Sequence, residues 1–414
     1  MAGVCAIVPS GLDVPTVLYR SQSAHGPIIA AMPASSPPQQ TDLFEALPLP
    51  AEPAARDAQQ APGPAAGAAR EQRSAVPAQR MPPQRSSTAV RAAHPDARVH
   101  ALAAGLPPRL RMGTSSWHFP GWAGLVWDGD YDQSQLSRQG LIAYAAHPLL
   151  RSVSLDRAFY RPLSTQQYAH YAAQVPHDFR FVVKAPSLVC DALVRAEDGR
   201  GRAPNPMFLN PELALREFIQ PALQGLGHKV GALVFQLSPL PRARLAELPA
   251  LIERIGALLA AMPPLAPTAP DGVLAIEVRD AAFLAPAHAP QLAQALCTAR
   301  QAFGNPITYC LGLHAKMPPI EAQLPLLRAL WPGPLVCRWN LHRRHGAYGY
   351  ESAKAQYAPF NRLQDPDPET RAHLARVIKG TCGAGQNAYV TINNKAEGSA
   401  PLSVLELATQ FGRL

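Results

Sequence analysis

Residues 230–261 read VGALVFQLSPLPRARLAELPALIERIGALLAA and join a short apolar run to a longer amphipathic one. Val230–Leu237 is almost wholly apolar, which predicts a strand buried on both faces. Arg242–Ala261 predicts an amphipathic helix, because apolar side chains recur in it at helical spacing: Leu245, Leu248, Leu251, Ile252, Ile255, Leu258 and Leu259. A buried strand followed by such a helix is the repeating unit of α/β proteins.

Seven further strand–helix pairs are predicted on either side of this one. The other strands are predicted at Arg111–Ser116, Arg151–Asp156, Phe179–Ala185, Val273–Arg279, Ile307–Leu313, Leu335–Asn340 and Ala388–Asn393. The other helices are predicted at Ser134–Ala146, Ser164–Gln174, Pro211–Gln224, Ala287–Phe303, Ile320–Leu330, Pro368–Lys379 and Leu402–Phe411. Eight such units in about 300 residues are what a (β/α)8 TIM barrel requires.

A doubly wound parallel sheet is the competing architecture. Such a sheet is expected to carry a glycine-rich phosphate loop after its first strand. The segment RMGTSSW at 111–117 contains neither G-x-G-x-x-G nor G-x-x-x-x-G-K-[ST]. The predicted fold class is therefore α/β, with a TIM-barrel domain at 109–414.

Residues 1–108 differ in composition from the rest of the chain. They hold 17 of the 45 prolines, much alanine and two aromatic residues, Tyr19 and Phe44. Such a segment cannot bury enough apolar surface to offset the entropy of ordering it. We predict a disordered, low-complexity Ala/Pro-rich extension; a regulatory docking segment and a mis-assigned start codon are the alternatives.

Charge and cysteine content exclude several classes of protein. No stretch reaches the roughly 18 apolar residues of a membrane span. The six cysteines form no C-x-x-C pair, which argues against a disulfide scaffold or zinc ribbon and favours a reducing, cytoplasmic compartment. The net charge is +9 over 414 residues. This charge suits a small anionic ligand or a nucleic acid as partner, and nothing indicates an oligomeric state.

Polar residues collect where the predicted strands end, which in a TIM barrel is the end that carries the chemistry. The strand starts have fewer polar residues, as in Arg151-Ser-Val, Gly231-Ala-Leu and Gly272-Val-Leu. The enrichment in polar residues is therefore predicted to be one-sided. The candidates for catalysis are Glu277, Asp156 and Lys184, and the candidates for substrate binding are Arg279, Gln236, Arg338, Asn340, Asn394, Lys395, Trp117 and Tyr160.

Several of these residues have both a structural and a functional interpretation. Glu277 shares a strand face with Arg279 and is expected to meet Arg279, Lys184 or Arg338, either as a buried ion pair or as a general base. Lys184 is expected to form an ion pair, with a Schiff-base lysine as the alternative. Trp117 either stacks on a ligand or closes the first loop. No H-x-H or H-E-x-x-H pattern indicates a metal, and no cofactor is indicated.

The sequence resembles the YecE-like family, domain of unknown function 72. The resemblance rests on motifs that occur in order along the chain: Gly113-Thr-Ser-Ser-Trp117 with Trp122, Phe159-Tyr160, Phe179-Arg-Phe-Val-Val-Lys184-Ala-Pro, Phe235-Gln236-Leu, Ile276-Glu277-Val-Arg279 and Tyr389-Val-Thr-Ile-Asn393-Asn394 with Gly398-Ser-Ala-Pro401. It implies a TIM barrel and a site at its mouth that includes Lys184, Gln236, Glu277, Arg279 and Asn394. It implies no reaction.

The chain is a divergent relative at its second strand. The family typically reads Val-Glu-Ile-Asn-Ser-Thr-Phe-Tyr there, whereas this sequence reads Val153-Ser-Leu-Asp-Arg-Ala-Phe-Tyr160. Ser154 thus stands where the family has glutamate, and Asp156 where it has asparagine. We interpret Asp156 as a replacement for the missing acid.

The resulting hypothesis is a cytoplasmic enzyme that acts on a small phosphorylated or sugar-like substrate by carboxylate acid/base chemistry. Glu277 would be the acid/base and Asp156 the second carboxylate, with Lys184, Arg279 and Arg338 as anion anchors. Alanine at Glu277 is then expected to abolish turnover and leave the fold intact. The alternatives are a nucleic-acid-binding or phosphodiester-processing barrel and a non-catalytic metabolite-binding protein.

Overall fold

Eight parallel strands form a closed barrel in the computed structural model, which describes residues 89–196, 201–346 and 349–414. The predicted TIM barrel is confirmed. The strands follow one another around the barrel in chain order, and their bounds agree with the prediction to within two residues: β1 Leu110–Thr114, β2 Ser152–Leu155, β3 Arg180–Lys184, β6 Val230–Gln236, β7 Val273–Glu277, β8 Ile307–Leu313, β9 Leu335–Trp339 and β10 Ala388–Ile392.

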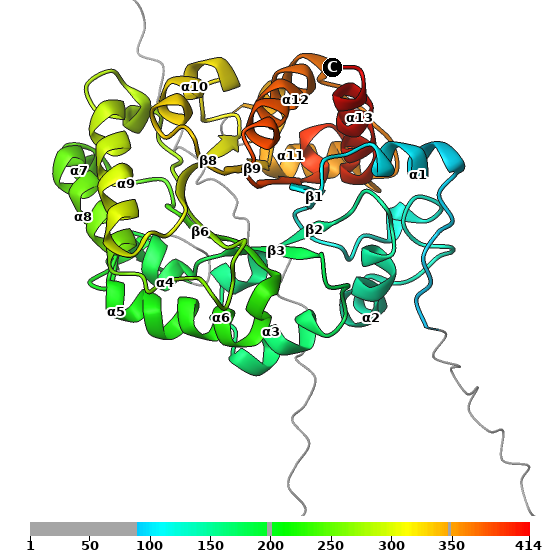
Figure 1. The fold of residues 1–414 in the computed structure, drawn as a ribbon, viewed down its shortest axis with the longest axis horizontal. Helices are drawn as coiled ribbons and strands as arrows, with labels where there is room; N and C mark the ends of the chain where they lie inside the picture. The colour runs from blue at the N-terminus through cyan, green and yellow to red at the C-terminus, as the bar shows by residue number, and fades with distance from the viewer. Residues whose placement is uncertain (1–88, 197–200, 347–348) are drawn as a thin grey trace, which may run out of the picture. The chain divides into compact units, whose positions relative to one another are not determined.

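Helices surround the ring of strands (Figure 1). Several begin with a side-chain cap: Ser164 and Gln167 form a capping box, and Asp132 and Asp367 each accept a backbone N–H of the first turn. The longer helices are α2 Gln133–Ala145, α3 Thr165–Ala172, α8 Leu248–Ala260, α9 Ala289–Phe303, α10 Ile320–Ala329, α12 Pro368–Gly383 and α13 Ala400–Gly412. None of the described helices is both long and apolar enough to span a membrane.

Two predicted helices are interrupted near prolines. The helix expected at Pro211–Gln224 is α5 Pro211–Ala214, a π-helical turn at Leu215–Ile219 and α6 Gln220–Leu226. The helix expected at Arg242–Ala261 is α7 Arg242–Leu245 followed by α8, which has a proline in its first turn. Proline lacks the N–H that a regular helix needs in its interior, so the hydrogen-bond ladder changes beside it.

Short elements in the connections complete the described fold. α4 Ser187–Cys190 follows β3, and β4 Leu193–Arg195 pairs with β5 Gly201–Pro204 as an antiparallel ribbon. α11 Tyr350–Tyr357, which the sequence analysis did not predict, follows β9.

The chain is already folded before the predicted domain start. Most of the predicted extension, residues 1–88, lies outside the described residues. Residues 97–104, which the sequence placed in that extension, form helix α1 Ala97–Ala104, capped by Asp96. α1 packs against α13, because Val99, Leu102 and Ala103 give it one apolar face.

The inside of the barrel is a small apolar core. It contains Cys310, whereas Cys337 belongs to the larger hydrophobic core; both cysteines are fully buried, as expected from their apolar surroundings. Smaller residues from four other strands, with Tyr389, fill the same space: Val182, Ala232, Val234, Ala275 and Val336.

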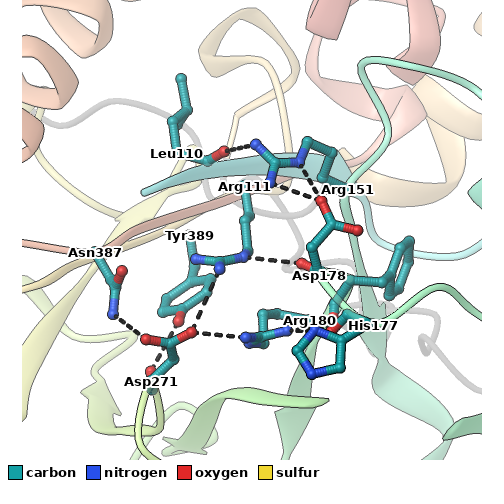
Figure 2. Close-up of polar contacts among 10 residues, drawn as sticks. Leu110, Arg111, Arg151, His177, Asp178, Arg180, Asp271, Asn387 and Tyr389 are labelled. Carbon is teal, nitrogen blue, oxygen red and sulfur yellow. Dashed lines mark hydrogen bonds and ion pairs between the residues drawn. The ribbon is translucent and has the colours of Figure 1, made fainter. Parts of the chain in front are cut away.

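Charged residues also gather at the amino-terminal end of the barrel, so the predicted one-sided enrichment is wrong. Figure 2 shows Asp271 between two arginines that begin β1 and β3. Asp271 Oδ2 accepts from Arg180 Nη2 at 2.7 Å and from Arg111 Nη2 at 3.3 Å, and Oδ1 accepts from Asn387. The sequence did not reveal this cluster, because Asp271 precedes its strand and its partners come from distant segments. The chemistry of TIM barrels lies at the opposite end, so we expect this network to stabilise the fold.

Asp271→Ala is expected to lower the free energy of unfolding by about 3 kcal/mol, because it leaves two buried guanidiniums without their shared carboxylate. Urea denaturation measures this loss. The matched control is Asp178→Ala at the same end, whose carboxylate is largely exposed and pairs with Arg151. It is expected to lose less than about 1 kcal/mol. Equal losses in the two variants would contradict the role given to Asp271.

The same carboxylate makes stability depend on pH. Burial alone would raise the pKa of Asp271, but the hydrogen bond from Arg180 and the charge of Arg111 outweigh burial and hold the pKa below its usual value. A carboxyl with a lowered pKa in the folded state stabilises the protein above its unfolded-state pKa of about 4. The wild type is therefore expected to lose its advantage over Asp271→Ala as the pH falls below about 4.

Candidate active site

Three charged residues that the sequence placed at one rim are brought together at the carboxyl-terminal end of the barrel. Lys184 and Glu277 are the last residues of β3 and β7, and Arg338 is the penultimate residue of β9. All three side chains are buried. The expected convergence of strand ends is confirmed for these residues.

Arg338 is the centre of the cluster. Its Nη1 donates to Gln236 Oε1 at 2.8 Å and to Glu277 Oε2 at 2.7 Å. Its Nη2 donates to both carboxylate oxygens of Asp156, each at 2.7 Å. Arg279 completes the group, with its Nη2 on Gln236 and its Nε 2.8 Å from Glu277 Oε1. We call these five side chains the arginine–carboxylate network.

The network joins side chains of strands that are not neighbours. β8 lies between β7 and β9, and Gly312 of β8 is paired with Arg338. A Cβ at Gly312 would lie 3.6 Å from Glu277 Cγ, which is ordinary van der Waals contact. Arg338 on β9 thus reaches Glu277 on β7 past the intervening strand.

The two carboxylates of the network have different environments. Glu277 is 0% exposed, and each of its oxygens faces an arginine. Burial by itself would raise the pKa of Glu277, but Arg279 and Arg338 outweigh burial and lower it. Asp156 has a side chain that is 18% exposed, and its Oδ1 also accepts from Ser154 Oγ at 2.6 Å. Asp156 is therefore the carboxylate of this network that solvent can reach.

Lys184 does not form the expected ion pair. Its Nζ lies 3.5 Å from the centroid of the Phe159 ring, and the residue is 3% exposed. Among the described residues Nζ has no hydrogen-bond or ion-pair partner. Burial, with a smaller contribution from Arg338 and Arg279, lowers the pKa of Lys184 to about 7, against the opposing charge of Asp156.

Lys395 is a second buried lysine at this end of the barrel. Its Nζ lies 4.0 Å from the centroid of the Tyr350 ring and 5.7 Å from that of Phe360. Within the described segments no carboxylate pairs with it. Tyr160 is partly buried and feels the charges of Asp156 and Arg338, and burial raises the pKa of its hydroxyl above the usual value.

Three predicted ligand-binding residues have structural partners instead. Trp117 is buried, donates from Nε1 to the carbonyl of Leu136 and packs edge-on against Tyr171, so it closes the first loop. Asn394 accepts from Trp122 Nε1 and from the backbone of Ala400. Asn340 donates to the carbonyl of Arg338. These contacts hold the three side chains within the fold, although Asn394 Nδ2 is buried without a hydrogen-bond partner among the described residues.

A small cavity reaches the network beside Asp156. Its volume of about 30 Å³ has room for a water molecule or two. Ser116 and His118 line it, with 2.8 Å between Ser116 Oγ and His118 Nδ1. Burial and the charge of Arg157 lower the pKa of His118 to about 4, so the ring is neutral at pH 7. The sequence analysis gave neither His118 nor Phe159 a role, because each lies in an aromatic-rich loop where packing was the simpler interpretation.

The described residues contain no group of three or more His, Cys, Asp or Glu side chains that could hold a metal ion. The carboxylates at the mouth face arginines, which occupy the positions that a cation would take.

Comparison with known proteins supplies the family. The family model described as protein of unknown function DUF72 matches residues 111–414. None of the curated proteins matches the chain.

Similar solved structures include two proteins of this family. A DUF72 family protein from Enterococcus faecalis V583 is 17% identical with a TM-score of 0.47, and the alignment covers 73% of this chain and 95% of that one. A DUF72 family protein from Thermotoga maritima MSB8 is 18% identical with a TM-score of 0.39, covering 73% and 98%. A xylanase, XynB from Paenibacillus barcinonensis, solved with a conduramine derivative, is 9% identical with a TM-score of 0.37, covering 73% and 91%. Since the family model spans most of the sequence, the chain belongs to the DUF72 family, as its motifs predicted.

Proposed function

We propose that this protein is an enzyme that binds a small anionic substrate, phosphorylated or sugar-like, at the carboxyl-terminal mouth of the barrel. The observation that carries the proposal is an excess of buried positive charge. The arginine–carboxylate network holds two guanidiniums and two carboxylates, so its formal charge is zero. Lys395 adds a positive charge to it, and its described partners are the ring faces of Tyr350 and Phe360. A buried ammonium without an anion is unfavourable, and an anionic ligand would relieve this.

The anion anchor in this proposal is Lys395. Arg338 directs both terminal nitrogens at protein oxygens, and Arg279 pairs with Glu277. The arginines therefore orient the carboxylates and have few N–H groups left for a ligand. This differs from the expectation that Arg279 and Arg338 hold the substrate.

Asp156 is the acid/base group in this proposal. It is the carboxylate with solvent access, and Arg338 and Ser154 fix its orientation. Positioned proton transfer by such a group contributes roughly 10²–10⁴ to a rate. Glu277 takes the role of a positioning residue, because it is fully buried and solvent does not reach it.

The nucleic-acid alternative finds less support at this mouth. It relied on aromatic rings interleaved with arginines, and Trp117, Trp122 and Trp127 are buried in the first loop. Stacking on bases requires exposed ring faces.

Thermal unfolding with a ligand panel tests the proposed anion site. Inorganic phosphate, glycerol 3-phosphate and glucose 6-phosphate are expected to raise Tm by about 2 °C or more at saturation, and neutral glucose is not. Lys395→Met is expected to weaken this binding about tenfold or more, because it removes one ammonium that meets the anion. Lys379→Met, on the exposed face of α12, is the charge-matched control. Equal binding in the two variants would contradict the site.

A second variant separates catalysis from simple binding. Asp156→Asn keeps the size and polarity of the side chain but removes its basicity. If the protein is an enzyme, the ligand that raises Tm in this panel is converted by the wild type, and Asp156→Asn binds it with turnover reduced by about 10² or more. Binding without conversion by the wild type would favour the non-catalytic alternative.

A further inference from the structure

Lys184 differs from Lys229, a partly buried lysine just before β6, in what surrounds its amine. Lys229 donates from Nζ to two backbone carbonyls, of Ala172 and Val175, each at 2.7 Å. Lys184 has no such acceptor among the described residues and lies instead against the face of Phe159. An ammonium carries three N–H donors that need acceptors, whereas a neutral amine keeps a lone pair and needs fewer. The surroundings of Lys184 therefore suit the neutral amine.

The charges around Lys184 act in the same direction. Arg338 and Arg279 disfavour a further cation, Asp156 and Glu277 favour it, and burial outweighs both. The neighbouring thiol of Cys190 is fully buried, and burial raises its pKa, so it adds no charge. With a pKa of about 7, a large fraction of Lys184 is unprotonated at neutral pH.

We propose that Lys184 is a nucleophilic amine that forms a Schiff base with a small aldehyde or ketone carrying the anionic group. This inference rests on the proposed function and names the substrate class of the same site. The geometry that supports it is a desolvated lysine at the carboxyl-terminal end of a barrel strand, next to a carboxylate that solvent can reach. Desolvation in an apolar pocket is one of the ways in which proteins activate lysine for carbonyl chemistry.

The chemical step is a condensation that releases one water. The Nζ lone pair attacks the carbonyl carbon, a C–N bond forms, and the carbonyl oxygen takes a proton to give a carbinolamine. Nitrogen then loses a proton, the C–O bond breaks as the oxygen leaves with a second proton as water, and a C=N bond remains. We assign these proton transfers to Asp156, because it is the carboxylate of the network that solvent can reach and its charge acts on Lys184. No oxidant or reductant is needed.

The Phe159 ring covers the amine of Lys184, so a substrate must pass this ring to reach it. Phe159 and Tyr160 are partly exposed, and they follow Asp156 in the same loop. A carbonyl compound reaches Nζ when the Phe159 ring turns aside. The substrate is therefore expected to be small, and its anionic group is expected to bind Lys395.

Reductive trapping of the full-length protein tests this inference. Dihydroxyacetone phosphate and pyruvate are the probes, sodium cyanoborohydride reduces any C=N bond to a stable secondary amine, and peptide mass mapping locates it. One adduct per chain is expected, on Lys184, among only six lysines in the sequence. Lys184→Arg and Lys184→Met are expected to reduce trapping at least about tenfold, whereas Lys379→Met keeps it. The trapping rate is expected to rise with pH around 7.

The controls distinguish failure of this inference from failure of the proposed function. Glycerol 3-phosphate is anionic but has no carbonyl group. If it raises Tm and neither probe is trapped, the anion site stands and the nucleophilic role of Lys184 is wrong. If it has no effect and no probe is trapped, both proposals are wrong. Adducts that persist unchanged in Lys184→Met, on Lys395 or surface lysines, would also overturn the role of Lys184.

Discussion

Replacing Glu277 by alanine is expected to lower the free energy of unfolding by roughly 3–5 kcal/mol, among the largest effects of any single substitution in this barrel. Glu277 is fully buried, and its two oxygens pair with Arg279 and Arg338 at 2.8 and 2.7 Å. Without it, Arg338 keeps the carboxylate of Asp156, and Arg279 loses its carboxylate partner. The expectation from sequence, that this variant keeps its fold, does not agree with this geometry.

Two variants make the test specific. Glu277→Gln keeps the volume and one acceptor oxygen but removes the charge, so its loss is expected to fall between those of wild type and alanine. Glu253→Ala, on the exposed face of α8, removes an acid without a buried partner and is expected to stay within about 0.5 kcal/mol of wild type. Guanidinium denaturation measures all three. A loss below about 1 kcal/mol for Glu277→Ala would show that the network does not stabilise the barrel.

The position of the site could be predicted from sequence, because parallel strands that close into a barrel must end at the same rim. Lys184, Glu277 and Arg338 lie there as expected. The hydrogen-bond and ion-pair partners of these side chains could not be predicted from the order of the strands. Arg338 pairs with Glu277 across β8, a contact between strands that are not neighbours and that strand spacing does not encode.

Because strand spacing does not encode side-chain partners, the contacts of Lys184 and Trp117 could not be predicted either. A lysine at a strand end forms an ion pair only if a carboxylate points toward it. Here the carboxylates of Glu277 and Asp156 both accept hydrogen bonds from Arg338. Trp117 had two interpretations from sequence, and the choice depended on whether Tyr171 and the carbonyl of Leu136 lay within reach. Helix α1 was missed because its apolar face is short and lies within an alanine- and proline-rich context.

Lys184→Met is expected to stabilise the protein at pH 7 by a few kcal/mol while removing carbonyl trapping. Methionine fills the space of the lysine stem without a group that must be desolvated. The folded-state pKa of Lys184 is about 7, and an unfolded lysine titrates near 10.4. Each unit of this difference corresponds to about 1.4 kcal/mol, so burial of the lysine opposes folding most strongly at and below neutral pH.

The direction in which the free energy of unfolding changes with pH distinguishes removal of a buried amine from a simple improvement in packing. Between about pH 7 and 10 the unfolded wild type binds a proton at Lys184 that the folded state does not, so wild-type stability rises with pH through this window. Lys184→Met has no such dependence, and its advantage over wild type is expected to shrink between pH 7 and about pH 9.5. Urea denaturation of both proteins at the two pH values measures the change, with Lys379→Met as the control for a surface charge. A variant less stable than wild type at pH 7, or an advantage that does not change with pH, would mean that Lys184 is held as an ammonium, and the amine chemistry proposed for it would then lose its physical basis.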